Sequence, residues 1–414
     1  FAILLVAFLA ACSAPESTAP ATDTNPLPPE KRILPEVEQA HSLETANLLN
    51  IGYGAAVVSR TAELTLDNSA VRAIDGDAES MWATPALDYE QTLVFSLPAP
   101  ARIAKVGVRT PAVTFSHMKT ASIDLSTDGA TWTEVAKMQL DPKTEPQLFD
   151  ITPRNAQFVR LRSHEGGARI GALQSVHVRG EWLAARVTPA IAGCWMVNGE
   201  RATFTETSGR VSGNIGDLLL DGGRSGATYR FAWARGSAWG YALMTITPDD
   251  KSLSGIRWHE EAAQHSFGTS WFGDRATCAP AATKPETVVA TFLRRAGWYP
   301  LFSLQFDAWD RLVEGESSGG IEIIGDIVRR IPNHRIRIVS REYHETNADA
   351  NRKRTAARIE SLKATLARRG MNLSNVDFVA LGSSEPRRPT ATEPMRLLYG
   401  VVEIEIPAEA RASF

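Results

Sequence analysis

The sequence lacks most of the features that identify common enzymes and nucleic-acid-binding proteins. Its 44 Lys and Arg residues stand against 47 Asp and Glu residues, giving a net charge of −3. A protein that binds nucleic acid mainly by neutralising phosphates needs a positive surplus, so we expect no nucleic-acid partner. There is no Walker loop, and no pair of histidines has the spacing of the H-E-x-x-H zinc motif. We therefore expect a protein that is not an enzyme.

Cysteine is scarce, with only Cys12, Cys194 and Cys278 in 414 residues. The spacing excludes a C-x-x-C metal site. If Cys12 carries another modification, two cysteines remain. In an exported chain, two remaining cysteines predict a disulfide between Cys194 and Cys278. Two buried thiols are the alternative.

Residues 1–12 decide the expected compartment. Phe1 to Ala11 is an apolar stretch that ends in small residues and is shorter than the roughly 20 residues of a membrane-spanning helix. Such a stretch is typical of the apolar part of a signal peptide. The string Leu9-Ala10-Ala11-Cys12 resembles the lipobox of bacterial lipoproteins, which implies lipidation at Cys12. Ser13 follows where the family's inner-membrane retention signal has Asp, which favours an outer-membrane lipoprotein facing the periplasm or the surface. An ordinary secretory peptide is the alternative.

Residues 13–45 are rich in Pro, Ala, Ser, Thr and Glu. This composition cannot bury enough apolar surface to order itself, so we expect a disordered linker that holds the rest of the chain away from the membrane.

Residues 46–182 predict an all-β domain, because short runs of strand-forming residues alternate with turn residues. The runs are Thr92–Ser96, Ala104–Val108, Ser122–Leu125, Phe158–Leu161 and Val176–Val178. The string from Ala73 to Trp82 (A-I-D-G-D-A-E-S-M-W), Ser126 to Trp132 (S-T-D-G-A-T-W) and Ala156 to Leu161 resemble three motifs of discoidin-like (factor V/VIII type C) domains in the family's order. The resemblance implies a galactose-binding-like jelly-roll sandwich and a glycan partner. We expect Trp82 and Trp132 in its core.

Two ligand sites are expected in this domain. Asp75, Asp77 and Ser80 occupy positions that often hold Ca²⁺ in the discoidin family, and their oxygens suit a hard cation. A turn held only by Asx hydrogen bonds is the alternative. Sugar binding requires an aromatic face together with planar hydrogen-bonding groups. Candidate glycan-binding residues on the expected loops are Tyr89, Phe115, His117, His164 and Arg169.

Residues 183–283 predict a second β domain, rich in Gly and Trp, with strands that follow one another as a meander. Frequent Gly and alternating apolar residues favour a sheet that curls into a small barrel-like domain.

Residues 284–414 predict an α/β domain. Leu301–Phe306 alternates as a strand, Ile324–Ile331 and Ala356–Leu366 have helical spacing, and Val376–Leu381 and Val401–Ile406 read as further strands. Three strings resemble motifs of the OmpA-like peptidoglycan-binding domain: Leu304-Gln305-Phe306-Asp307, Asn351 to Arg358, and Val402-Glu403-Ile404. The resemblance implies that Arg358, with Asn351, binds the carboxylate of a peptidoglycan peptide, for which a guanidinium is well suited. The family's loop Asp falls on Tyr343, next to Glu342.

The sequence thus predicts a multidomain, mainly β, non-catalytic tether of the cell envelope. It would bind glycan, contact peptidoglycan and associate with a membrane through lipid at Cys12. One rival hypothesis is an enzyme or ligand-binding accessory with its site inside the barrel. A barrel interior filled by Trp and Leu would count against that rival. The other rival is a structural subunit of an envelope complex.

Overall fold

A computed structural model of the chain describes residues 46–85, 90–112, 117–166, 171–260, 268–278, 284–343, 347–385, 398 and 400–414. All of them belong to one compact unit. No helix among these residues is both long and apolar enough to cross a membrane. The fold is mainly β with an α/β end, as predicted.

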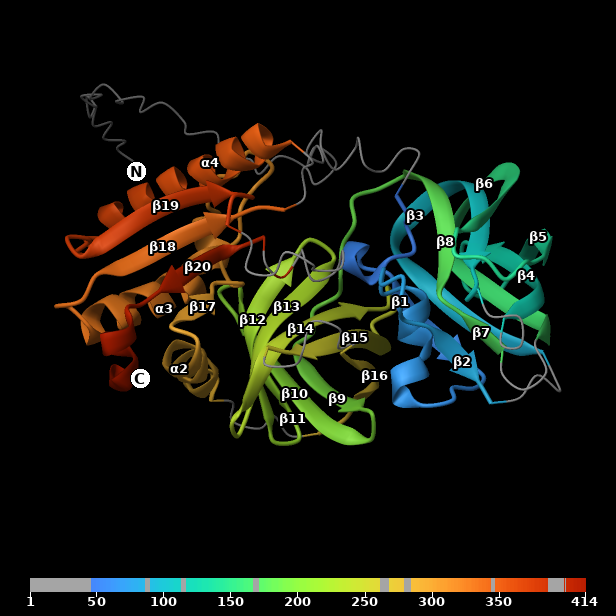
Figure 1. The fold of residues 1–414 in the computed structure, drawn as a ribbon, viewed down its shortest axis with the longest axis horizontal. Helices are drawn as coiled ribbons and strands as arrows, with labels where there is room; N and C mark the ends of the chain where they lie inside the picture. The colour runs from blue at the N-terminus through green and yellow to red at the C-terminus, as the bar shows by residue number, and fades with distance from the viewer. Residues whose placement is uncertain are drawn as a thin grey trace, which may run out of the picture. The chain divides into compact units, whose positions relative to one another are not determined.

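Residues 46–182 form a β-sandwich (Figure 1). The main sheet has the strand order β1-β3-β6-β4-β5, with β8 also paired to β3, and a second small sheet pairs β2 with β7. The strands are β1 (Ala56–Arg60), β2 (Trp82–Thr84), β3 (Gln91–Arg109), β4 (Met118–Ser126), β5 (Thr133–Gln139), β6 (Gln147–Gly166), β7 (Gly171–Leu173) and β8 (Ser175–Trp182). All five predicted runs lie in strands of the main sheet. Residues alternate between the core and the outer face of this sheet, as the two-residue period of a strand requires.

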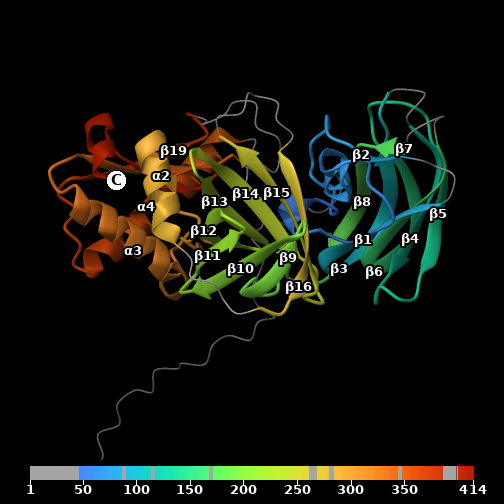
Figure 2. The same ribbon diagram turned by 90° about the horizontal axis from the view of Figure 1, so that it is seen from below.

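The barrel is a closed, antiparallel meander of eight strands (Figure 2). Its strands are β9 (Gly193–Val197), β10 (Glu200–Thr207), β11 (Arg210–Ile215), β12 (Leu218–Ser225), β13 (Thr228–Arg235), β14 (Ala238–Ile246), β15 (Ser252–His259) and β16 (Thr269–Ala276). β16 pairs with β9 and closes the ring, so no strand edge is left unpaired. The predicted disulfide between Cys194 and Cys278 is confirmed.

The C-terminal domain is α/β, with a four-stranded sheet in the order β17-β20-β18-β19. β18 and β19 are parallel, while β20 is antiparallel to both of its neighbours. The elements are α2 (Pro285–Arg295), β17 (Trp298–Pro300), α3 (Glu314–Arg330), β18 (Ile336–Arg341), α4 (Ala348–Arg368), β19 (Val376–Gly382) and β20 (Val402–Glu405).

One predicted strand of this domain is wrong. Residues 301–306 form a turn, and the strand is β17, three residues earlier. The backbone N–H of Leu304 donates to the carbonyl of Leu301, which closes the turn and ends the sheet. The apolar residues that mimicked strand alternation are buried by packing instead, since Leu301, Phe302 and Leu304 all belong to the main hydrophobic cluster.

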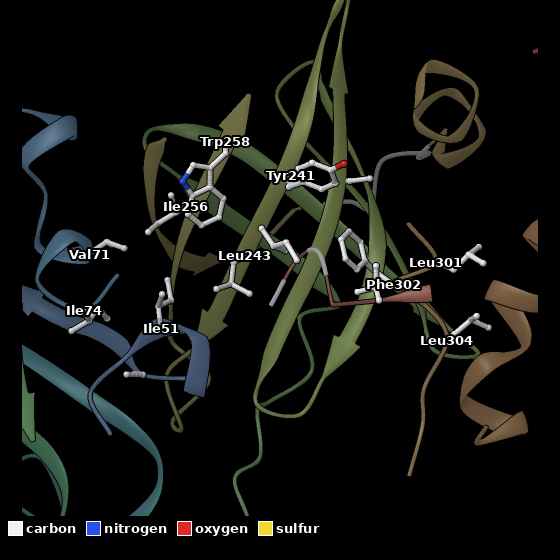
Figure 3. Packing of buried hydrophobic residues seen from close by; sticks show 14 of the residues in the cluster. Ile51, Val71, Ile74, Tyr241, Leu243, Ile256, Trp258, Leu301, Phe302 and Leu304 are labelled. Atoms are coloured by element: carbon white, nitrogen blue, oxygen red, sulfur yellow. The ribbon is translucent and has the colours of Figure 1, made fainter. Parts of the chain in front are cut away.

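The outer wall of the barrel is fused to both neighbouring domains through one hydrophobic cluster (Figure 3). Hydrogen bonds cross both junctions: Val57 N–H donates to Ser254 Oγ at 2.8 Å, and the Tyr299 hydroxyl donates to an Asp221 carboxylate oxygen at 2.5 Å. Backbones also approach closely at Gly209, which has a φ of +78° and whose added Cβ would lie 1.6 Å from the carbonyl oxygen of Glu316. Only glycine fits there. The barrel therefore holds its neighbours by packing rather than through flexible linkers.

Candidate functional site

The loop that resembles a calcium-binding motif is closed by hydrogen bonds within the chain. The backbone N–H of Asp77 donates to Asp75 Oδ1 at 2.9 Å, and the Ser80 hydroxyl donates to Asp75 Oδ2 at 2.7 Å. Arg72 adds a guanidinium 3.4 Å from the same oxygen. Burial, opposed by Arg72 and Ser80, raises the pKa of Asp75 to about 7.

This arrangement matches the Asx-turn alternative better than the calcium alternative. Arg72 and Asp75 are both almost fully buried, so the guanidinium already supplies the positive charge that a cation would bring. Arg72 also donates to the carbonyl of Gly268 in the barrel at 2.7 Å. No group of three or more acidic, His or Cys side chains suited to a metal is found in the part of the chain that the structure describes. The prediction of Ca²⁺ at Asp75, Asp77 and Ser80 remains a prediction.

The five predicted sugar-binding residues fall into two groups. Tyr89, Phe115 and Arg169 lie outside the described residues. His117 is buried and bridges to Ala172. His164 lies on the outer face of β6, partly exposed.

Charged side chains gather around His164 on the outer face of the sheet, a set that we call the Asp124 cluster: Asp124, Arg160, Arg162, Glu134, Glu90 and His164. Asp124 is buried and accepts from the Nε of both Arg160 and Arg162 at 2.7 Å. Arg162 also donates to Glu134 at 2.7 Å. Hydrogen bonding to Asp124 raises the pKa of Arg162.

An aromatic ring lies beside these charges. The guanidinium of Arg160 stands over the ring of Trp132, 4.5 Å from its centroid. Trp132 is only half-buried, so its predicted core position is wrong, whereas Trp82 is in the core as predicted. A half-exposed indole beside planar donors and acceptors is the combination that a sugar ring requires. The alternation of Arg160, Arg162 and His164 along one strand could have revealed this face from the sequence.

Three members of this face have the order of a serine hydrolase triad. The Ser122 hydroxyl lies 2.9 Å from His164 Nε2, and His164 Nδ1 lies 3.0 Å from Glu90 Oε2. Ser122 is fully buried, however, and it sits in the middle of β4 with a paired strand on each side. A nucleophile needs access to its substrate and free backbone donors for an oxyanion, and the position of Ser122 provides neither of these.

A second serine string, Gly315-Glu316-Ser317-Ser318-Gly319, matches the G-x-S-x-G pattern. That pattern needs a sharp turn between a strand and a helix, with the serine exposed at its top. Here α3 already begins at Glu314, and Ser317 is buried with its hydroxyl bonded to the backbone of Gln305. Ser317 therefore does not have the exposed position between a strand and a helix that this pattern requires.

The C-terminal domain contains a compact group of charges that we call the Arg358 cluster: Arg354, Arg358, Asp310 and Glu342. Arg358 on α4 donates its Nε to Asp310 at 2.8 Å and lies with Nη1 2.9 Å from Glu342. Arg354, one turn earlier, contacts the other oxygen of Asp310 at 3.1 Å. Glu342 directly follows β18. It lies beside Tyr343, where the OmpA-like resemblance places the loop acid, and it is the residue that contacts Arg358.

The two predicted peptidoglycan-binding residues have different surroundings. Arg358 is 12% exposed and contacts both acids of its cluster. Asn351 lies two turns earlier on α4, buried, and its backbone carbonyl accepts from Thr355 at 3.0 Å. Asp310 and Arg354 were not identified from the sequence, because only the fold brings the loop after β17 to this face of α4.

The barrel interior is filled by a separate hydrophobic cluster. Its largest members are Trp195, Trp233, Trp271, Tyr229 and Phe231, packed with Leu and Val side chains. Trp195 donates its indole N–H to the carbonyl of Ile191, and Trp233 donates to the carbonyls of Tyr241 and Trp258. An interior of this kind counts against a polar active site inside the barrel.

Comparison with known proteins finds one matching family model and several similar solved structures. Residues 72–161 match the model of the NedA-like, galactose-binding domain. No curated protein matches the chain. Similar solved structures include the C-terminal domain of a chitobiase from Bacteroides fragilis (18% identity, 31% of this chain and 95% of that chain, TM-score 0.30). Chitosan-binding module 1 of a chitosanase/glucanase from Paenibacillus sp. IK-5 (22%, 33% and 99%, 0.29) and the family 32 CBM of Clostridium perfringens NanJ in complex with galactose (18%, 30% and 98%, 0.27) are also similar.

Proposed function

We propose that this chain is a non-catalytic, lipid-anchored tether of the bacterial envelope that binds glycan through its sandwich and peptidoglycan through its C-terminal domain. The observation that carries the proposal is the match of residues 72–161 to a galactose-binding domain, on a segment that folds as a sandwich. The packed barrel supports a non-catalytic role, because the aromatic side chains in its interior are buried against one another and do not line a polar pocket.

The glycan site is proposed on the Asp124 cluster and Trp132. Arg160, Arg162 and His164 project from one strand and offer planar donors, while the Trp132 ring is half-exposed. Because the donors are already oriented by carboxylates, little side-chain entropy is lost on binding.

A glycan array probed with the full chain tests this site. We expect binding that is lost in His164→Ala and in Trp132→Ala. The matched control is Arg102→Ala, which removes an exposed charge from β3 of the same sandwich. Binding that survives both site variants would place the glycan elsewhere, and no binding to any glycan would overturn the function itself.

The peptidoglycan site is proposed at the Arg358 cluster. The C-terminal domain resembles an OmpA-like domain in the motifs at residues 304–307, 351–358 and 402–404. The site is supported by the 2.9 Å contact between Arg358, at the arginine position of that family, and Glu342, which lies directly beside Tyr343 at the family's acid position. A ligand carboxylate would replace one of the acids at the guanidinium, and a ligand amine would contact the acid released.

Retention on purified peptidoglycan sacculi tests this assignment. Arg358→Lys keeps the charge but loses the fork of parallel donors, so we expect weaker retention in a variant that still folds. The control is Arg352→Ala, an exposed arginine on the same helix. Equal retention of wild type, Arg358→Lys and Arg358→Ala would remove Arg358 from the site.

Anchoring through Cys12 completes the proposal, on the lipobox resemblance of residues 9–12. Mass spectrometry of the protein purified from envelopes should find that residue acylated and N-terminal. An unmodified thiol in a chain recovered from the cytosol would overturn the envelope role.

A further inference from the structure

The loop that carries Asp310 also exposes a tryptophan to solvent. Trp309 is 67% exposed, and it is the only large hydrophobic residue exposed in the described part of residues 284–414. Exposing an indole leaves its apolar surface in water, which costs free energy in the unbound protein. An indole exposed to this degree is accessible to a ligand.

The loop around Trp309 is held firmly. Asp307 Oδ1 accepts from the backbone N–H groups of Trp309 and Arg311, each at 2.9 Å, and its Oδ2 accepts from Arg311 Nε at 2.8 Å. The backbone N–H of Asp310 donates to the carbonyl of Asp307 at 3.0 Å. These bonds fix the backbone from which the Trp309 side chain projects, so the loop is preorganised for a ligand.

Trp309 adjoins the Arg358 cluster. Asp310, the next residue, has a φ of +58° and receives ion pairs from Arg354 and Arg358. The Arg311 guanidinium stands 4.9 Å from the centroid of the Trp309 ring. The exposed Trp309 ring thus has charged neighbours in the sequence before and after it: Asp307 on one side, and Asp310 and Arg311 on the other.

This setting favours a sugar over a protein or a membrane. A protein interface has an apolar centre built from several residues, and an interfacial membrane anchor needs a broad apolar face. Trp309 stands alone among charged neighbours. The Arg358 cluster pairs two arginines with two acids, so it gives no net attraction for a polyanion. A pyranose ring presents a small apolar face with hydroxyls around its rim, which matches one ring with planar polar groups beside it.

We propose that Trp309 is a stacking platform for a pyranose ring of a polysaccharide strand, next to the Arg358 cluster that takes the carboxylate of an attached peptide. This inference rests on the proposed peptidoglycan function and deepens it, because the domain would then recognise both the sugar and the peptide parts of the wall.

The test uses the full chain with 5-fluorotryptophan at its ten tryptophans, observed by ¹⁹F NMR. Trp309→Phe assigns the Trp309 resonance, and Trp132→Phe assigns the tryptophan of the sandwich. A linear N-acetylglucosamine tetrasaccharide without peptide is the first probe, and a diaminopimelate-containing stem peptide without sugar is the second. Phospholipid vesicles are the third.

We expect the tetrasaccharide to shift the Trp309 resonance in wild type and in Arg358→Lys alike. On sacculi, we expect Trp309→Ala to weaken binding by about tenfold, with Trp309→Phe in between. The inference is overturned if the chemical shift of the Trp309 resonance does not change with the tetrasaccharide, or if it changes only with vesicles. Sacculus binding that depends on Arg358 but not on Trp309 also overturns it while leaving the proposed function in place. A saccharide-induced shift with sacculus binding independent of Arg358 keeps the platform and removes the peptide site.

Discussion

The Asp124 cluster of the sandwich and the Arg358 cluster of the C-terminal domain both pair arginines with a buried carboxylate, but they are built in different ways. In the sandwich, two arginines from one strand converge on a single acid, and each has further contacts. In the C-terminal domain, one arginine joins two acids that come from separate loops. In the sandwich both arginines therefore meet the same acid, whereas in the C-terminal domain Asp310 has Arg354 as a second partner and Arg358 is the shared contact of both acids.

Among the substitutions in the two clusters, the largest expected effect comes from removing the shared arginine. Arg358→Ala leaves Glu342 and Asp310 buried with fewer opposite charges, and breaking such a pair costs about 3 kcal/mol. Arg162→Ala leaves Asp124 paired with Arg160, so we expect a loss of about 1 kcal/mol. Urea unfolding of both variants measures the difference. Equal losses would show that the two clusters tolerate the removal of an arginine equally well.

The same difference explains what the sequence could predict. Strand alternation places Arg160, Arg162 and His164 on one face whatever the rest of the fold does, so the sandwich face could be read from the sequence. The contact of Asp310 with Arg358 joins residues 48 positions apart, with α3 and β18 between them in the chain, and no local sequence pattern indicates such a contact. Glu342 was within reach, because the OmpA-like resemblance places the loop acid at Tyr343, directly beside it.

Secondary structure shows the same limits. The eight-stranded meander was predictable because every strand pairs with its neighbour in sequence, or with the first strand on closure. The error at 301–306 arose because apolar alternation there serves packing against the barrel. Helix α2 has Pro285 at its start and a stripe of buried residues including Val288 and Phe292, so it could have been predicted from its spacing.

A pH titration extends the comparison to a third pair, Arg72 and Asp75, in which a buried carboxylate lies 3.4 Å from a guanidinium. The pKa of Asp75 is raised to about 7 from 3.8, so the folded state holds a proton that the unfolded state has lost. The stability from this group is full below about pH 4 and is lost as the pH rises through about 7. We expect a contribution of about 2 to 4 kcal/mol over this window.

The measurement is the free energy of unfolding between pH 4 and 8 for wild type and Asp75→Asn. The contribution of His177 to the pH dependence must be subtracted, because burial and the charges of Arg179 and Arg109 lower its pKa to about 4. Its contribution has the opposite sign: stability increases with pH between about 4 and 6.5. Both proteins contain His177, so the difference between their curves isolates Asp75. Parallel curves would mean that Arg72 keeps Asp75 ionised throughout.

Calcium should have a smaller effect than pH. Because the Arg72 guanidinium occupies the charge-neutralising position beside Asp75, we expect saturating Ca²⁺ to leave the melting temperature unchanged in wild type. A ligand that binds only the folded state would raise it. A rise that disappears in Asp77→Ala would instead establish the calcium site and require Arg72 to move away.

The smallest expected effect concerns Ser122, whose bonds have the order of a catalytic triad on the very face proposed to bind glycan. His164 Nε2 faces the hydroxyl and Nδ1 faces Glu90, so His164 could accept a proton from Ser122. The obstacle is access: Ser122 is fully buried, and β4 is paired on both sides. An acyl or phosphonyl group on Ser122 would have to displace His164 or open the sheet. We therefore expect no labelling of the folded protein by a fluorophosphonate probe, with Ser122→Ala as the matched blank. Labelling that disappears in that blank would turn the sandwich face from a binding surface into an active site.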